Sequence, residues 1–209
     1  PCGTLFPYTT LFRSGTPCGN KSDQDYAVPS WIFKLTRWQK RLFLSSFFGA
    51  ELSSPSTVTD HDYNFYPQVI SMNKHEQFLD SGYQFLNDIK SLLEEFNVSS
   101  KIIKKRKEYV NKKGIVSFRL RLQISSKIEN LLALWQKIGF EYNKKRRHLA
   151  NSAIYYLKLK NKILLERSNA DRKAKELKKE GISASKIFKQ LQSRYVNKRF
   201  LERSLYDER

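Results

Sequence analysis

One acidic residue stands at the end of a short apolar segment and is the strongest candidate for chemistry in this chain. Residues 44–52 read Leu-Ser-Ser-Phe-Phe-Gly-Ala-Glu-Leu, which predicts a helix that ends close to Glu51. A helix C-terminus carries partial negative charge, so a carboxylate there favours a nearby cation. Divalent metals bind carboxylate and carbonyl oxygens. The position of Glu51 therefore indicates a metal ligand, with an ordinary core helix as the alternative.

The same segment resembles a known motif. Ser45, Ser46 and Gly49 are small, so another helix can approach this one closely. Residues 44–52 align with the nine places of the core motif of LAGLIDADG (dodecapeptide, DOD-type) homing endonucleases and resemble it, with Glu51 at the place of the metal-binding acid. Gly49 stands where the motif often has Asp, and Leu52 where it usually has Gly. Neither departure removes the carboxylate.

The resemblance implies a mechanism that involves two units. In this family two motif helices pair, and their acids hold Mg²⁺ (or Mn²⁺) at the scissile phosphates of double-stranded DNA. Glu51 and the backbone carbonyl of Ala50 are the metal ligands that this chain would supply. Lys144 is the candidate for an assisting catalytic base, with Lys145 beside it on the DNA; for both, a plain phosphate-contact or solvent role is the alternative.

Hydrophobic periodicity predicts an α+β fold for the elements that position these residues. The predicted order is helix, two strands, helix, two strands and helix, over residues 36–50, 57–62, 65–73, 78–96, 101–109, 114–125 and 128–138. This order is the αββαββα unit of the LAGLIDADG family, with a curved antiparallel sheet. Pro67 indicates a bulge or an edge in the second strand, and Gly139 ends the third helix. Asn73 and Lys74, at the end of the second strand, are weaker candidates for positioning water.

The predicted strand over 114–125 carries the clearest candidates for DNA recognition. By the two-residue period of a strand, Arg119, Arg121 and Gln123 point to the face opposite the apolar residues. Guanidinium and amide groups match the edges of guanine and adenine in a major groove. Lys104 and Arg106, on the neighbouring strand, are better suited to phosphates. An ordinary solvated sheet face is the alternative.

The distribution of charge points to a polyanionic partner. Residues 1–100 hold 8 Lys and Arg against 10 Asp and Glu, whereas residues 101–209 hold 31 against 10. Such asymmetry favours nucleic acid over an anionic membrane. The sequence contains no apolar run long enough to span a bilayer and no secretory signal. We therefore expect a cytoplasmic protein with no membrane partner.

The first residues carry no fold information. Residues 4–14 read as the translation of a common sequencing adapter, so we exclude them and expect that the natural protein begins further upstream. Cys2 adjoins this segment, which leaves Cys18 as the one credible cysteine, in keeping with a reducing compartment. Residues 18–32 resemble the link before the second repeat of archaeal inteins, notably those of the RNA ligase that joins tRNA halves. Splicing residues are not recognisable, so we expect no self-splicing.

The chain beyond residue 150 predicts a second DNA-binding module. A basic helix over 154–166 and a charged helix over 170–179 precede two short helices, the first of them with Ser183 as its N-cap. The last two resemble a helix-turn-helix, whose final helix would present Lys198, Arg199 and Arg203 to DNA. A structural appendage is the alternative. The predicted boundaries are an adapter-derived segment, a linker, the LAGLIDADG unit, a connector helix and the helix-turn-helix, at 1–14, 15–35, 36–150, 151–168 and 169–209.

These inferences predict the second LAGLIDADG unit of an intein-encoded DNA endonuclease. The chain contains one copy of the motif, so the partner is either a missing upstream unit, which we favour, or a second copy of this chain. Two alternatives stay open: a DNA-binding remnant that no longer cuts, and an RNA-binding maturase.

Overall fold

The computed structural model describes residues 19–110 and 114–206, which form an α+β fold of two compact units. The first unit ends at Ile154 and the second begins at Tyr155. The expectations about residues 4–14, Cys2 and Cys18 lie outside the described residues. Within the described ranges, no helix has both the length and the apolar character that crossing a membrane requires.

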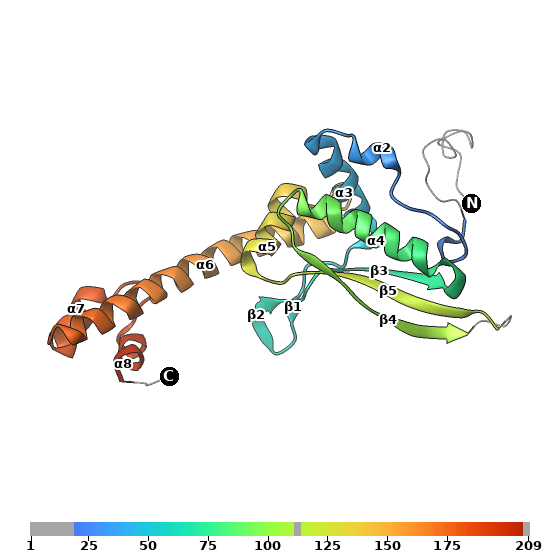
Figure 1. Ribbon diagram of the computed structural model, residues 1–209. Coiled ribbons are helices and arrows are strands. Elements are labelled where there is room, and N and C mark those ends of the chain that lie inside the picture. The colour runs from blue at the N-terminus through green and yellow to red at the C-terminus, as the bar shows by residue number, and fades with distance from the viewer. Residues whose placement is uncertain (1–18, 111–113, 207–209) are drawn as a thin grey trace. The chain divides into compact units, whose positions relative to one another are not determined.

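A three-stranded antiparallel sheet is the centre of the first unit (Figure 1). Its order is β3-β5-β4, where β3 is Val69–His75, β4 is Ser100–Val110 and β5 is Val116–Ile124. Central strand β5 alternates as predicted: Leu120, Leu122 and Ile124 are fully buried, and the residues between them are only half-buried. This alternation places one face of the sheet against the helices.

The predicted first strand pair is different in the structure. Strands β1 (Thr57–Val58) and β2 (His61–Phe65) form a two-stranded hairpin of their own, separate from the main sheet. The predicted bounds 57–62 and 65–73 are therefore wrong, because the chain already reverses at Asp60, whose φ of 61° is suited to a tight turn. Pro67 lies between β2 and β3, where its missing N–H interrupts the ladder.

Helix α4 (Leu79–Glu94) follows the short 3₁₀ helix η2 (Glu76–Phe78) and lies over one face of the sheet (Figure 1). Its apolar positions follow the predicted helical spacing and are buried. Gly82 allows the close approach to the sheet, because a Cβ there would lie 2.6 Å from Leu120 Cδ1. The amphipathic pattern of the sequence is thus confirmed as the main core-forming helix.

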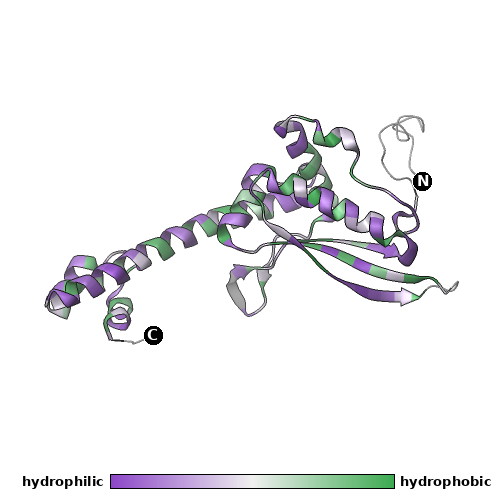
Figure 2. Ribbon diagram, in the orientation of Figure 1, coloured by the Kyte–Doolittle hydropathy of each residue, from purple (hydrophilic) through white to green (hydrophobic). Residues whose placement is uncertain are grey.

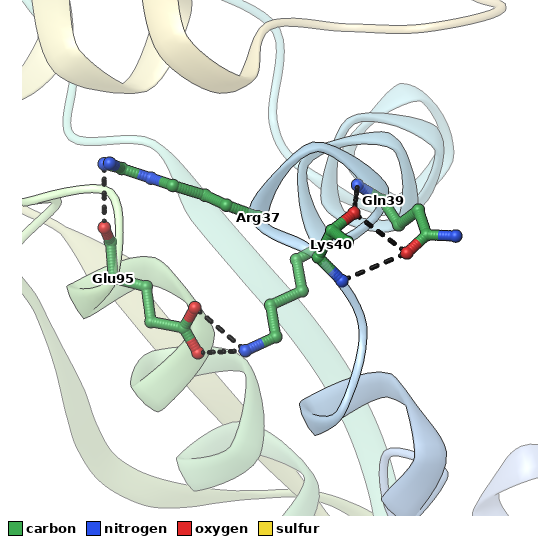
Figure 3. A network of polar contacts seen from close by, with 5 residues as sticks. Arg37, Gln39, Lys40 and Glu95 are labelled. Atoms are coloured by element: carbon green, nitrogen blue, oxygen red, sulfur yellow. Dashed lines mark hydrogen bonds and ion pairs between the residues drawn. The ribbon is translucent and has the colours of Figure 1, made fainter.

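The motif helix is α3 (Arg37–Glu51), one residue longer at its end than predicted. Thr36 caps its start, since the side chain accepts from the Gln39 backbone N–H and the Gln39 side chain accepts from the Thr36 N–H. Figure 3 shows this cap beside an ion pair that joins α3 to the end of α4. The nearly buried Lys40 Nζ lies 2.7 and 2.9 Å from the two carboxylate oxygens of Glu95.

Short helical segments complete the first unit. The 3₁₀ helix η1 (Lys21–Asp23) and helix α2 (Ser30–Phe33) precede α3. Helix α5 (Ile128–Ala133) continues into a π-helical turn, η3 (Leu134–Ile138). Gly139, with φ of 74°, ends this third helix as predicted.

Helix α6 (Lys144–Lys179) begins in the first unit and continues into the second, so the two helices predicted within it are one. Neither Gly nor Pro occurs between its ends. Helices α7 (Ala184–Leu191) and α8 (Lys198–Tyr206) pack against its last turns. The buried residues of this small core are Ala170, Ala174, Ile187, Val196, Leu201 and Leu205.

Candidate active site and nucleic-acid interface

Glu51 is the last residue of α3, and its side chain is 39% exposed. The next residue, Leu52, is buried and forms an antiparallel bridge with Ile70 on β3. This bridge fixes the end of α3 at the free edge of the sheet. Ala50, the other predicted metal ligand, is exposed beside Glu51.

The partner of Glu51 in this structure is a lysine from the N-terminal linker. Lys21 Nζ lies 3.3 Å from Glu51 Oε1, and the Lys21 side chain is 58% exposed. Exposed pairs of this kind contribute about 0–1 kcal/mol. Within residues 19–110 and 114–206, no group of three or more His, Cys, Asp or Glu side chains is placed to hold a metal ion. Glu51 is thus an accessible single carboxylate and not a complete metal site.

Glu51 and Lys21 lie at a cavity of about 480 Å³ between α3, the linker and β3. Asn73, a weaker sequence candidate, lines the same cavity, as does Tyr26. Burial raises the pKa of the Tyr26 hydroxyl, and the negative charge of Glu51 raises it further. The structure therefore brings Glu51 and Asn73 to one cavity in which a tyrosine is held in its neutral form.

Lys74, the other weaker candidate, does not have the predicted role of positioning water. It is fully buried on the helix-facing side of β3, where Nζ donates to the Gln24 carbonyl at 2.6 Å and lies 3.9 Å from the ring centre of Tyr26. Burial lowers the pKa of Lys74, and the charge of Asp25 acts in the opposite direction. Lys74 is a structural residue that holds the linker on the sheet.

The basic residue that reaches the end of α3 is Arg146, which the sequence analysis did not select. Its Nη1 donates to the carbonyl oxygens of Phe48 and Gly49, both at 2.9 Å, and its Nε donates to Ser54 Oγ at 3.3 Å. Lys144 and Lys145 are exposed at the start of α6. The motif helix therefore has a cation at its C-terminus already, supplied by this chain.

Part of the small-residue face of α3 is covered within the chain. The Glu141 N–H donates to the Ser45 carbonyl at 3.0 Å, and a Cβ on Gly49 would lie 2.5 Å from the Glu141 carbonyl oxygen. Asn143 Nδ2 donates to the Gly49 carbonyl at 2.7 Å. The predicted close approach thus occurs on this side, but the approaching segment is the loop before α6 and not another helix.

A second side of α3 remains open in the first unit. Trp38 is 64% exposed, Leu42 and Ser46 are half-buried, and Ala50 is exposed. Their spacing of four residues places them along one face of the helix. This face ends beside Glu51.

The predicted DNA-contacting residues of β5 lie on the face of the sheet opposite α4. Arg119, Arg121 and Gln123 are paired with Asn73, Ser71 and Val69 of β3, and paired residues share a face. On the other side, Arg106 is paired with Arg119. Lys104 lies in an irregularity between Ile103 and Arg106, and both basic residues are exposed. Figure 2 shows that β4 is mostly hydrophilic.

An acidic residue that the sequence analysis missed lies within this basic face. Glu108 Oε1 is 3.0 Å from Arg119 Nε and 3.9 Å from Arg106 Nη2, and the Glu108 side chain is only 12% exposed. The signal was present, because Glu108 is the one acid in a strand that otherwise has five basic residues. It belongs to this basic face as much as the arginines do.

In the second unit, Lys198, Arg199 and Arg203 are exposed on α8, as predicted. Lys198 Nζ lies 3.7 Å from Glu202 Oε1 on the same helix. Ser183 is at the N-cap position of α7, as predicted, although its side chain makes no capping hydrogen bond. A side-chain cap is found instead at α8, where Asn197 Oδ1 accepts a hydrogen bond from the Phe200 N–H at 2.9 Å.

The comparisons with known proteins find relatives of far greater length. No protein-family model matches the chain, and no solved structure is significantly similar to it. The chain is 33% identical over 94% of its length to the tRNA-splicing ligase RtcB of Methanocaldococcus jannaschii and to that of Pyrococcus furiosus, and covers 20% and 19% of these proteins. It thus spans about a fifth of the length of these archaeal ligases.

A protein with a different name is also similar. The DNA-directed RNA polymerase subunit Rpo1N of Methanocaldococcus jannaschii is 31% identical over 72% of this chain, and the match covers 11% of that subunit. A ligase and a polymerase subunit of one organism therefore each contain a segment similar to this chain.

Proposed function

We propose that this chain is one unit of an intein-encoded, site-specific double-stranded DNA endonuclease of the LAGLIDADG type, which requires a second such unit to cut. The observation that carries the proposal is the accessible carboxylate of Glu51 at the end of α3, at the free edge of a sheet whose open face carries Arg106, Arg119 and Arg121. An acid beside a basic, strand-built surface suits phosphodiester hydrolysis on a bound duplex.

The distribution of the relatives supports an inserted element. Two proteins with unrelated names each match most of this chain within a small part of their own length. A mobile segment carried by different host proteins accounts for that pattern, and an intein is such a segment. The ligase and polymerase activities that those names state are not assigned to this chain.

The residues fit a metal ion only as part of a site. Mg²⁺ is commonly bound through one or two carboxylates together with water and substrate phosphate. Glu51 and the Ala50 carbonyl are the ligands that this chain would offer to Mg²⁺ (or Mn²⁺). A bound ion would activate water and stabilise charge on the departing oxygen. The other acid has to come from a second unit.

The open face of α3 is the surface that we assign to that unit. Trp38, Leu42, Ser46 and Ala50 give it an apolar and partly small-residue character, and a helix packed there would end close to Glu51. Our preferred partner is an upstream repeat of the same protein, and a second copy of this chain is the alternative.

One observation favours a DNA-binding remnant as the second candidate function. Lys21 already neutralises Glu51, and the described residues supply a single acid at this position. A remnant would bind duplex DNA in the same way and never cut it.

The experiment compares the wild-type chain with Glu51→Gln, alone and joined to an upstream unit, on a pool of random-sequence duplexes with Mg²⁺. We expect equal duplex binding by both proteins, cleavage by the wild type in the two-unit form, and no cleavage by Glu51→Gln. The control is Glu76→Gln, which changes another exposed carboxylate and should cut normally.

Each other outcome has a distinct meaning. Binding without cleavage by the wild-type two-unit protein would leave the remnant as the function. Unchanged cleavage by Glu51→Gln would refute this residue as a ligand. Preference for structured RNA over duplex DNA would support a maturase instead.

A further inference from the structure

The irregular pairing of β4 places Glu108 where a charged side chain is unusual. Lys107 is paired with Phe118 and Tyr109 with Ser117, so Glu108 is the extra residue of a β-bulge. It lies two residues after Arg106 and on the same open face. Bulges re-aim side chains, and this one directs a carboxylate into the centre of a basic surface.

The two arginines beside Glu108 would repel each other without it. Arg106 and Arg119 are direct partners across β4 and β5, an arrangement that destabilises an antiparallel pair when the charges are alike. The Glu108 carboxylate lies closer to Arg119, at 3.0 Å, than to Arg106, at 3.9 Å. Its single negative charge therefore offsets part of the repulsion between the two arginines, and its closer ion pair is with Arg119.

The position of Glu108 determines which nitrogen atoms of Arg119 remain available to a ligand. The contact with Arg119 is made to Nε, so the two terminal nitrogens of that guanidinium remain as a pair of donors. Such a pair matches O6 and N7 of guanine. The Arg119 side chain is 43% exposed and Arg106 is 70% exposed, so Arg106 is the freer of the two and better suited to a phosphate.

We propose that Glu108 is a specificity-determining residue that positions Arg119 to read a guanine in the major groove. This inference rests on the proposed function, since it assumes a duplex on the open face of the sheet. Arg119 lies on central strand β5, between Asn73 of β3 and Arg106 of β4. A side chain that is already ordered loses less entropy on binding, so preorganisation increases discrimination at one base pair and leaves phosphate contacts unchanged.

The test uses the full chain and a pool of random-sequence duplexes. After selection, the enriched duplex and its single-base variants are titrated by fluorescence anisotropy against the wild type, Glu108→Gln and Arg119→Lys. We expect Arg119→Lys to lose preference for guanine at one position, and Glu108→Gln to weaken the same preference by about 3- to 10-fold. Lys104→Gln, in the neighbouring irregularity of β4, should lower affinity for every sequence and reduce the salt dependence by about one ion.

A purely structural role for Glu108 gives a different result. Glu108→Gln would then unfold at lower denaturant concentration yet select the same bases as strongly as the wild type, which would overturn the inference while leaving the proposed function intact. A loss of preference at every position would also overturn it. A wild-type chain that selects no duplex sequence would instead refute the proposed function, and this inference with it. If Glu108→Gln does not fold, Glu108→Asp decides the point. It keeps the negative charge but moves it away from Arg119, so it should weaken the same guanine preference, and an unchanged preference would contradict the inference.

Discussion

Replacing Arg146 with Ala should destabilise the first unit more than any other basic substitution at the start of α6. Arg146 closes the motif helix by donating Nη1 to two carbonyl oxygens at 2.9 Å and Nε to Ser54. A hydrogen bond that involves a charged group contributes about 1.5–3 kcal/mol, and the half-buried position of Arg146 favours the lower end for its two short bonds. Because the change also leaves two carbonyls at a helix end without this partner, we expect a loss of about 2–3 kcal/mol.

The three tryptophans make the measurement specific to this unit. Trp31, Trp38 and Trp135 all precede residue 155, so urea unfolding followed by tryptophan fluorescence reports the first unit alone. The matched control is Arg147→Ala, because Arg147 is 51% exposed and its Nη1 lies 4.0 Å from Glu141 Oε1. Its loss should be under about 0.5 kcal/mol.

The comparison of the two variants decides the matter. Helix propensity changes equally in both, so it cancels in the difference. If Arg146→Ala lowers the free energy of unfolding by no more than Arg147→Ala does, then Arg146 does not stabilise the C-terminus of α3 in solution. Arg146→Lys should fall between them, because it keeps the charge and loses the planar fork.

Two further perturbations test the packing around α3 and the linker. Gly49→Ala should lower the stability of the first unit by about 1–2 kcal/mol, because the new Cβ would lie 2.5 Å from the Glu141 carbonyl oxygen and this cost exceeds the gain of about 1 kcal/mol in helix propensity. Urea unfolding measures the change, and Ala50→Gly provides the scale for helix propensity. A net gain in stability would contradict the close contact. Lys74→Met tests the burial of Lys74. The pKa of Lys74 is lower in the folded state than the ordinary 10.5, so the unfolded chain binds a proton more readily. The stability of the wild type relative to the variant should therefore fall as the pH drops from 10.5 to the lowered pKa. Unfolding of both proteins measured from pH 7 to 11 tests this, because the variant retains Tyr26 and so corrects for its ionisation, and a pH-independent difference would refute it.

The parts of the fold that depend on local pattern were predictable from sequence. The apolar spacing of α4, the alternation along β5 and the helix-ending Gly139 each require one segment and one period, and the structure confirms all three. The bounds of the first strands were not predictable in this way. An early reversal at Asp60 and the interruption at Pro67 divide them, and which residues pair is decided by the sheet edge as a whole.

In the candidate site, too, the elements that carry the residues were predictable from sequence, whereas the contacts between distant residues were not. Glu51 and the residues of β5 lie on the expected elements, and Glu51 and Arg119 are accessible, while their roles stay predictions. Their partners were not predicted, because Lys21, Arg146 and Glu108 reach them by contacts that no periodicity encodes. Lys21 is 30 residues from Glu51 in sequence, and Arg146 is 97 residues from Gly49. Buried Lys74 was missed for a related reason: nothing local distinguishes a lysine that packs under a linker from one in solvent.

These partners change the physical basis on which a metal can be assigned to Glu51. From the sequence, a carboxylate at a helix C-terminus indicated a nearby positive charge, and a metal ion was the candidate for that charge. The structure supplies that charge twice, through Arg146 on the carbonyls and Lys21 on the carboxylate, so electrostatic need no longer argues for an ion. What remains is accessibility. An exposed pair contributes at most about 1 kcal/mol, a small barrier for a divalent ion that a phosphate and a second acid also bind. The metal hypothesis therefore depends on the second unit, which is why the two-unit form of the Glu51→Gln experiment is the decisive one.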